Sequence, residues 1–168
     1  TPWYCAGCPH NSSTKLPDGE IVGMGIGCHS ISGFLTPNTI TNFPQMGGEG
    51  AFWIGRAPFS SYRHSFQNIG DGTYAHSGYL GIRAAVAAGV NITFKILYNG
   101  AVAMTGGQSV EGGQPPWVIS RQLAAEGVVK IAIVNGAPDA LLTGANWANN
   151  CQFYDRQDMP ALQQELKS

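Results

Sequence analysis

The chain has 168 residues, of which nine are basic and ten are acidic, so its formal net charge is −1. This balance disfavours a nucleic-acid-binding or membrane-surface protein, because both classes need an excess of basic residues. No run of 18 apolar residues occurs, and the first residues lack the basic and then apolar pattern of a signal peptide. We therefore expect a cytoplasmic protein with no membrane span.

The length fits one domain with a substantial core. The first residue is Thr rather than Met, so we expect residues 1–168 to be a single domain from a longer, multidomain chain. Only 11% of the residues are charged. Such a surface could be covered by partner domains or subunits, and we expect a dimer or a larger assembly.

Glycine is unusually frequent, with 23 residues, many of which cluster in four runs at 23–33, 47–55, 70–72 and 106–113. Runs of this kind allow the backbone to approach a ligand closely. Each run is therefore a candidate ligand-binding loop.

Near the N-terminus, Cys5 and Cys8 form a C-x-x-C pair in a loop-like segment. Such a pair can bind zinc, hold an iron–sulfur cluster, act in thiol redox chemistry or close a small disulfide. No second C-x-x-C occurs, which disfavours a Cys₄ zinc ribbon. Cys28 is a possible third thiolate and Cys151 the only remaining fourth, although both could equally be inert small hydrophobes.

Residues 21–27 read as a short strand that leads into a glycine-rich turn before Cys28. The dinucleotide-binding fingerprint needs a third glycine, which neither Gly23-x-Gly25 nor Gly25-x-Gly27 reaches. No Walker A lysine motif occurs either. The sequence thus disfavours a Rossmann dinucleotide site and an NTPase.

The centre of the chain predicts a strand that ends at Ile69 and a helix over 74–88, with Leu80, Ile82, Ala85 and Val86 available for burial. The segment Gly70-Asp71-Gly72-Thr73 joins them. A helix that starts directly after a strand places its free N–H groups at the carboxyl edge of the sheet, where they suit a phosphate group.

Asp71 would repel a phosphate unless a cation lay between the two charges. Mg²⁺ satisfies this condition, because it takes one or two protein carboxylates together with phosphate, amide and water oxygens. Asn99 follows the predicted strand 92–97 and could supply the amide oxygen, and the carbonyl of Ala101 could reach the same ion. An ordinary tight turn would explain Gly70 and Gly72 but not this carboxylate and amide.

The remaining segments complete an α/β pattern. We expect a helix from Pro115 to Glu126 ended by Gly127, a buried parallel strand over 128–134, and a loop over 136–150. An edge strand over 152–154 and a final helix capped by Asp158 follow. The predicted fold is therefore α/β, with a mostly parallel sheet and flanking helices.

A Gly-Asp-Gly turn followed 28 residues after its Asp by an Asn resembles the signature of thiamine-diphosphate enzymes. That family usually has Asn-Asn where this chain has Tyr98-Asn99, and only the second Asn is normally the ligand. The combination of motifs over roughly residues 1–135 resembles the thiamine-diphosphate region of the fused indolepyruvate ferredoxin oxidoreductases. These motifs are Cys-x-x-Cys-Pro-His-Asn, Gly-Ile-Gly-Cys-His, Gln-Met-Gly-Gly-Glu-Gly, Gly-Asp-Gly-Thr-Tyr and Ala-Met-Thr-Gly-Gly-Gln.

The resemblance implies a thiamine-diphosphate-binding fold with Mg²⁺ on the diphosphate, held by Asp71, Asn99 and Ala101. It also implies a 4Fe-4S cluster on Cys5, Cys8, Cys28 and Cys151. The other implied cofactor-binding residues come from the glycine-rich loops: Gly27, Cys28, His29, Gly47, Gly48, Glu49, Gly70, Gly72, Thr73, His76, Met104 and Thr105.

By the same resemblance, the whole enzyme would decarboxylate indolepyruvate or another 2-oxoacid, transfer the acyl group to coenzyme A and pass electrons to ferredoxin. The carboxylic acid that activates the cofactor is expected from the pyrimidine-binding domain, so the isolated chain should be inactive. His76 and Glu49 are secondary candidates for catalytic groups. Two alternatives remain: a non-oxidative thiamine-diphosphate decarboxylase or lyase without a cluster, and a non-catalytic iron–sulfur module.

Overall fold

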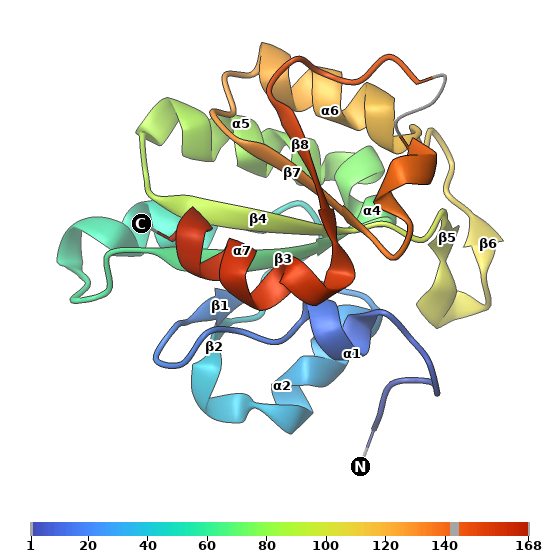
Figure 1. Ribbon diagram of the computed structural model, residues 1–168. Helices are drawn as coiled ribbons and strands as arrows, with labels where there is room; N and C mark the ends of the chain where they lie inside the picture. The colour runs from blue at the N-terminus through green and yellow to red at the C-terminus, as the bar shows by residue number, and fades with distance from the viewer. Residues whose placement is uncertain (1, 142–144, 168) are drawn as a thin grey trace.

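The computed structural model describes residues 2–141 and 145–167 and shows an α/β arrangement (Figure 1). A four-stranded parallel sheet has the order β2-β1-β3-β4, and β7 and β8 form a separate parallel pair. The strands are β1 (Val22–Gly23), β2 (Ile40–Asn42), β3 (Ser65–Gly70), β4 (Ile92–Leu97), β5 (Ala101–Val102), β6 (Gln108–Ser109), β7 (Ile131–Asn135) and β8 (Cys151–Asp155). This confirms the predicted fold class.

The α-helices are α1 (His10–Ser13), α2 (Ser32–Leu35), α3 (Ala51–Arg56), α4 (Asp71–Thr73), α5 (Tyr79–Ala88), α6 (Pro116–Ala125) and α7 (Met159–Leu166). Shorter turns are η1 (Cys28–Ile31), η2 (Pro37–Thr39), η3 (Ala57–Phe59), η5 (Ala103–Thr105), η6 (Pro138–Leu141) and η7 (Arg156–Asp158), and η4 (Tyr74–Gly78) is a π-helical segment. In the described part of the chain, no helix is long and apolar enough to cross a membrane.

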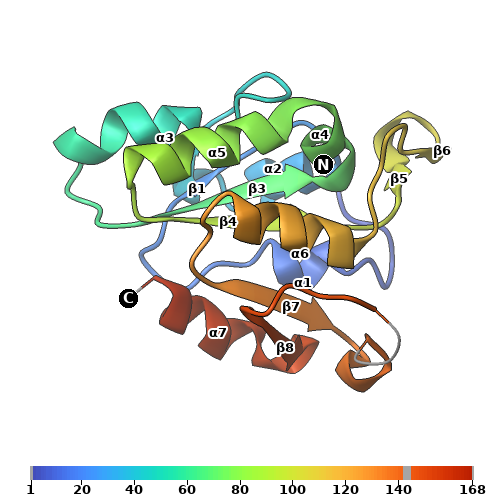
Figure 2. The same ribbon diagram turned by 90° about the horizontal axis from the view of Figure 1, so that it is seen from above.

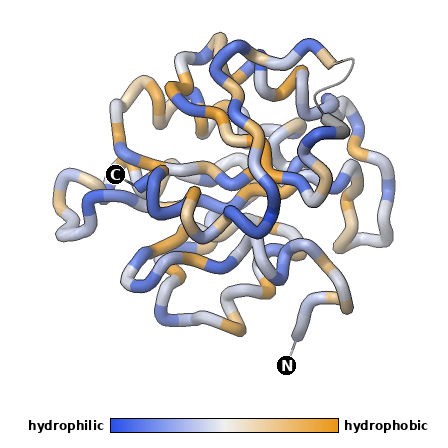
Figure 3. The backbone as a smooth tube through the Cα atoms, in the orientation of Figure 1, coloured by the Kyte–Doolittle hydropathy of each residue, from blue (hydrophilic) through white to orange (hydrophobic). Residues whose placement is uncertain are grey.

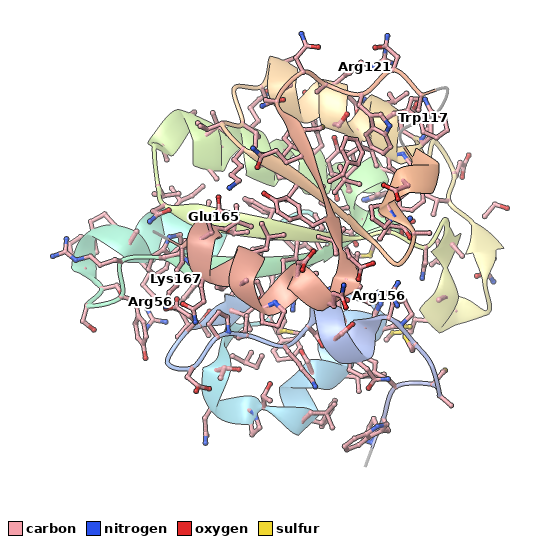
Figure 4. All side chains as sticks on the ribbon, viewed as in Figure 1. Arg56, Trp117, Arg121, Arg156, Glu165 and Lys167 are labelled. Atoms are coloured by element: carbon pink, nitrogen blue, oxygen red, sulfur yellow. The ribbon has the colours of Figure 1, made fainter. Side chains whose placement is uncertain are left out.

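The sheet lies between two layers of helices. Helices α3, α5 and α6 cover one face, and α1 and α7 lie on the other (Figure 2). On the first face, Ile69 and Ile82 form one buried cluster with Ile119 and Leu123 of α6 and with Ile131 of β7. In Figure 3 the hydrophobic colours follow the strands at the centre of the molecule. This cluster is the main hydrophobic core.

The crossover from β3 to β4 confirms the central prediction from the sequence. The two strands are parallel with Gly70 opposite Leu97, so the residues that follow each strand lie side by side. The helix predicted over 74–88 is a continuous helical run from Asp71 to Ala88, in which α4, the π-helical η4 and α5 follow one another without a gap. Its burial differs from the expectation, because Leu80 is 59% and Val86 is 36% exposed. The core reaches only the stripe of α5 that carries Ile82 and Ala85.

The other elements lie near their predicted positions, with shifted bounds. The strand expected over 21–27 is limited to Val22–Gly23, since the glycine-rich residues after it turn away into η1. The predicted end of α6 is confirmed: Gly127 has φ of 93°, and the N–H groups of Gly127 and Val128 donate to the carbonyls of Ala124 and Leu123. Of the loop predicted over 136–150, residues 142–144 lie outside the described residues.

The final helix is preceded by a capped turn. The side chain of Asp155 accepts a hydrogen bond from the N–H of Gln157 at 2.9 Å, whereas Asp158 makes no side-chain cap bond. The capping group is thus Asp155 rather than the predicted Asp158. Helix α7 is also bound to the sheet, because Lys95 of β4 donates to the side chain of Gln163 at 3.0 Å.

Candidate cofactor site

The carboxylate of Asp71 lies where β3 and β4 end. Its Oδ2 accepts hydrogen bonds from the backbone N–H groups of Asn99 at 3.1 Å and Gly100 at 2.6 Å, and its Oδ1 accepts one from Gly72 at 3.0 Å. Asp71 is only 5% exposed. The parallel register of the two strands brings this carboxylate to the turn that carries Asn99, although the two residues are far apart in sequence.

The three predicted magnesium ligands therefore come from one edge of the sheet, with Asp71 directly after β3 and Asn99 and Ala101 shortly after β4. The side-chain oxygen of Asn99 accepts the N–H of Ala101 at 3.0 Å, which fixes the turn between β4 and β5. Carboxylate, amide and carbonyl oxygens are the donors that Mg²⁺ prefers. The donor chemistry at this edge of the sheet fits a magnesium ion and, beside it, a phosphate group.

A hollow of about 260 Å³ opens next to this turn, and we call it the Asp71 hollow. Its lining residues are Asp71, Tyr98, Gly100, Ser109, Val110, Gly113, Gln114 and Pro115. It is somewhat smaller than the roughly 300–1,000 Å³ of typical ligand pockets. A larger hollow of about 470 Å³ is lined by residues from Trp53 to Arg63, which precede β3 and thus lie at the opposite edge of the sheet.

Two buried histidines lie near Asp71. The negative charge of Asp71 acts on His10 and raises its pKa, but burial is the larger effect and lowers the pKa of His10 overall. Burial and the neighbouring His10 lower the pKa of His29 to about 4, so its imidazole is neutral at physiological pH. The ring of His29 also lies close to the backbone of Gly70.

Glu49 is fully buried, in the second glycine-rich loop. Burial raises the pKa of its carboxyl group, although the backbone N–H groups of Gly47 and Ile26 oppose this shift. Because neither Glu49 nor His29 is exposed by more than 1%, their side chains are closed to a ligand in this structure. The backbone of the glycine-rich loops, rather than these side chains, is what a cofactor could reach.

The other predicted cofactor-binding residues lie farther out. His76 is exposed within η4, and its Nδ1 lies 2.8 Å from the hydroxyl of Ser77. Met104 is exposed in η5, and the Thr105 hydroxyl donates to Gln108 at 2.8 Å within the β5–β6 hairpin. Thr73, in contrast, is buried in α4, two residues after Asp71.

The four cysteines do not come together. Cys28 is close enough to Cys5 and Cys8 for their charges, together with burial, to raise its pKa. Cys151 instead lies in β8 and packs against the main core. Among residues 2–141 and 145–167, no three or more histidine, cysteine, aspartate or glutamate side chains are placed to hold a metal ion. The described structure thus does not fit the four-cysteine cluster that the sequence suggested.

Sequence reasoning missed the role of one buried polar side chain, Gln67. The amide of Gln67 in β3 accepts the N–H of Gly50 at 3.0 Å and donates to the carbonyl of Met24 at 2.9 Å, which joins two glycine-rich loops to the central strand. Gln67 lies in a strand that is buried along most of its length, and a polar residue in such a strand was the signal that could have marked it.

Comparison with known proteins agrees with the geometry in indicating a cofactor-binding domain. Residues 25–148 match the family model described as "Thiamine pyrophosphate enzyme, C-terminal TPP binding domain". No curated protein sequence gives a significant match.

One similar solved structure is a 2-oxoglutarate:ferredoxin oxidoreductase from Magnetococcus marinus with 2-oxoglutarate, coenzyme A and succinyl-CoA bound. Its TM-score is 0.58 at 18% sequence identity, and the alignment covers 92% of the present chain and 63% of that one. At this level of identity the likeness supports the fold.

Proposed function

Because this chain belongs to the thiamine pyrophosphate enzyme family as a C-terminal TPP-binding domain, we propose that it is the diphosphate-binding domain of a 2-oxoacid:ferredoxin oxidoreductase. The observation that carries the site is the contact between Asp71 and the turn of Asn99 and Gly100 at the carboxyl edge of the sheet. The chain spans 63% of the similar solved chain, and the activity, substrate and partners of the whole enzyme are therefore part of the proposal.

In this proposal Asp71, Asn99 and the carbonyl of Ala101 hold Mg²⁺ on the diphosphate. Asp71 keeps its carboxylate in place through three backbone N–H groups, so the ligand is oriented before the metal binds. The glycine-rich loops let backbone N–H groups approach the cofactor closely. Thiamine diphosphate, when bound, supplies the electron sink for decarboxylation of a 2-oxoacid.

The pyrimidine-binding domain of the same enzyme would form the other wall of the site. The modest volume of the Asp71 hollow supports this, because one domain alone encloses little of a cofactor-sized ligand. Indolepyruvate as substrate, coenzyme A as acyl acceptor and ferredoxin as electron acceptor rest on the sequence motifs. The similar solved protein, which contains a 2-oxoacid and coenzyme A, supports the same class of reaction.

The position of Cys151 favours a second candidate function. Cys151 packs against the core and away from the other thiols, so we do not propose an iron–sulfur cluster, or electron transfer through one, on the described cysteines of this chain. A non-oxidative thiamine-diphosphate decarboxylase would need the same magnesium site and no cluster. Iron and acid-labile sulfide in the anaerobically purified full-length protein would favour the oxidoreductase, and their absence would favour the decarboxylase.

The magnesium site is tested by Asp71→Asn in the full-length protein, measured by titration calorimetry with thiamine diphosphate and Mg²⁺. Asn retains an oxygen for the backbone N–H groups but loses the charge, so we expect affinity to fall by about 100-fold or more. Asp18→Asn, at an exposed loop position, is the matched control. Equal binding by wild type and Asp71→Asn would remove Asp71 from the site.

A further inference from the structure

Two fully buried polar side chains face the same glycine. Glu49 is 0% and His29 is 1% exposed, and neither Oε1 of Glu49 nor Nε2 of His29 has a hydrogen-bond partner among the described residues. A Cβ atom on Gly25 would lie 2.9 Å from each of these two atoms. They therefore converge on one point, and only glycine leaves room for both.

Glu49 connects two glycine-rich loops to a helix. Its Oε2 accepts the N–H of Gly47 at 2.7 Å, and the N–H of Ile26 also stabilises the carboxylate. Its own carbonyl oxygen lies against α5, where a Cβ on Gly81 would be only 2.4 Å away. Loss of this carboxylate would release both loops at once.

His29 fills the space beneath the loop that follows β1. Its ring carbon Cε1 lies 3.0 Å from the position of a Cβ on Gly27 and 3.7 Å from one on Gly70. The hydroxyl groups of Tyr4 and Ser32 donate to the carbonyl of His29, which holds its backbone in place. The ring is thus a spacer between the ends of β1 and β3, next to Gly70, which precedes Asp71.

Burial makes an unpartnered polar atom costly, and two such atoms beside each other suggest that they satisfy each other. A neutral imidazole can donate or accept at Nε2, and a carboxyl group can do the same according to its proton. One shared proton, passed directly or through a bridging water, would satisfy both atoms.

We propose that Glu49 and His29 are a positioning pair that holds the loops around Gly25 and Gly47 in the arrangement that binds the cofactor. Neither side chain touches the cofactor, since both are enclosed. This inference rests on the proposed function, and it changes the role expected for Glu49 from a catalytic or contacting group to a group that acts through the loop backbone.

The first test uses the cofactor-free, full-length protein with ¹⁵N-labelled histidine. Glu49→Gln changes only the group that faces His29, so we expect the ring ¹⁵N signals of His29, assigned with His29→Gln, to shift while the circular dichroism spectrum is unchanged. Glu111→Gln, at an exposed loop position, should leave them unmoved. Unchanged His29 signals in Glu49→Gln would overturn the pair.

The second test measures thiamine diphosphate affinity at saturating Mg²⁺. We expect Glu49→Ala to weaken binding by about 10-fold or more and Glu49→Gln to restore it to within about 3-fold of wild type. Wild-type affinity in Glu49→Ala would overturn the positioning role. If wild type itself does not bind the cofactor, the proposed function fails, whereas the His29 signals still decide whether the pair exists.

Discussion

Two buried polar regions of this chain satisfy their hydrogen bonds in different ways. Lys95 of β4 donates through Nζ to the carbonyls of Ser13 and Lys15, at 2.9 and 3.1 Å, and to Gln163. Every proton of this ammonium group has an acceptor within the chain. Glu49 and His29 each have a buried atom without a hydrogen-bond partner among the described residues, and both atoms lie beside Gly25, so the proposed pair has only its own two members to satisfy it.

We interpret this difference as a division of roles, in which Lys95 stabilises the fold and the glycine-rich edge serves cofactor binding. Lys95 connects the C-terminal end of α1 and helix α7 to the sheet, so it links the two end regions of the chain. Glu49 and His29 instead lie under the glycine-rich loops whose backbone a cofactor could reach, and their hydrogen bonding within the described residues is incomplete. Changes at Lys95 should therefore alter unfolding more than cofactor binding, and changes at the glycine-rich edge should alter binding at least as much as unfolding.

The largest expected effect is that of Lys95→Ala on stability. The buried side chain of Gln163 and the partly buried carbonyls of Ser13 and Lys15 lose their donor, so the free energy of unfolding should fall by about 3 kcal/mol. Urea denaturation measures this change. Lys167→Ala, which removes only the partly exposed pair with Glu20, should cost about 1 kcal/mol or less. A weaker cofactor affinity in Lys95→Ala at unchanged stability would contradict the comparison.

Gly81→Ala should affect both stability and binding. The new methyl group would lie 2.4 Å from the carbonyl oxygen of Glu49, so either α5 or the Glu49 loop must move. We expect a loss of about 1–3 kcal/mol in unfolding free energy together with weaker cofactor binding. Gly55→Ala is the matched control, because its Cβ meets nothing within 4 Å and should stabilise helix α3 by about 0.5–1 kcal/mol. Equal effects of the two substitutions would refute the close approach.

The pH dependence of unfolding should carry a contribution from Lys95. Burial lowers the pKa of Lys95 to about 7, whereas the unfolded chain holds its proton up to about pH 10. Between these values the unfolded state binds more protons, so stability should rise with pH, by at most about 1.4 kcal/mol per pH unit. Lys95→Met should flatten this rise in urea titrations from pH 7 to 10. An identical slope in the variant would show that Lys95 keeps its proton in the folded state.

The smallest expected effect is that of Tyr98→Asn, which restores the Asn-Asn pair usual in the family. Tyr98 lines the Asp71 hollow and is 46% exposed, but the predicted ligand is Asn99. We expect cofactor affinity within about 3-fold of wild type by calorimetry, which is less than 1 kcal/mol. A change of more than 10-fold would assign Tyr98 a direct part in binding.

The sequence was sufficient to predict the crossover from β3 to β4 and the edge of the sheet at which Asp71 lies. A strand, a Gly-Asp-Gly turn, a helix and a second strand predict one parallel unit, and its register alone brings Asp71 to Asn99. The fold class followed from the same alternation. These features depend on local residue patterns, which a sequence shows directly, and on the right-handed crossover that parallel β-α-β units almost always adopt.

The remaining features depend on contacts between distant segments. Nothing near Lys95 in the sequence indicates that its acceptors come from both ends of the chain, and nothing near Gly25 indicates that Glu49 and His29 meet there. The exposure of Leu80 depends on which stripe of α5 the core reaches. The four-cysteine prediction used only the number and spacing of the cysteines. It could not show that β8 pairs with β7 and that Cys151 therefore packs against the core.

The bonds from the Asn99 and Gly100 N–H groups to Asp71 also have a kinetic consequence. They can form only after the segment between residues 71 and 99 has closed into a parallel pair, which is entropically slow. A cofactor that recognises this turn binds the finished pair and not the open chain. We therefore expect added thiamine diphosphate and Mg²⁺ to lengthen the lifetime of the folded protein while leaving its refolding rate unchanged.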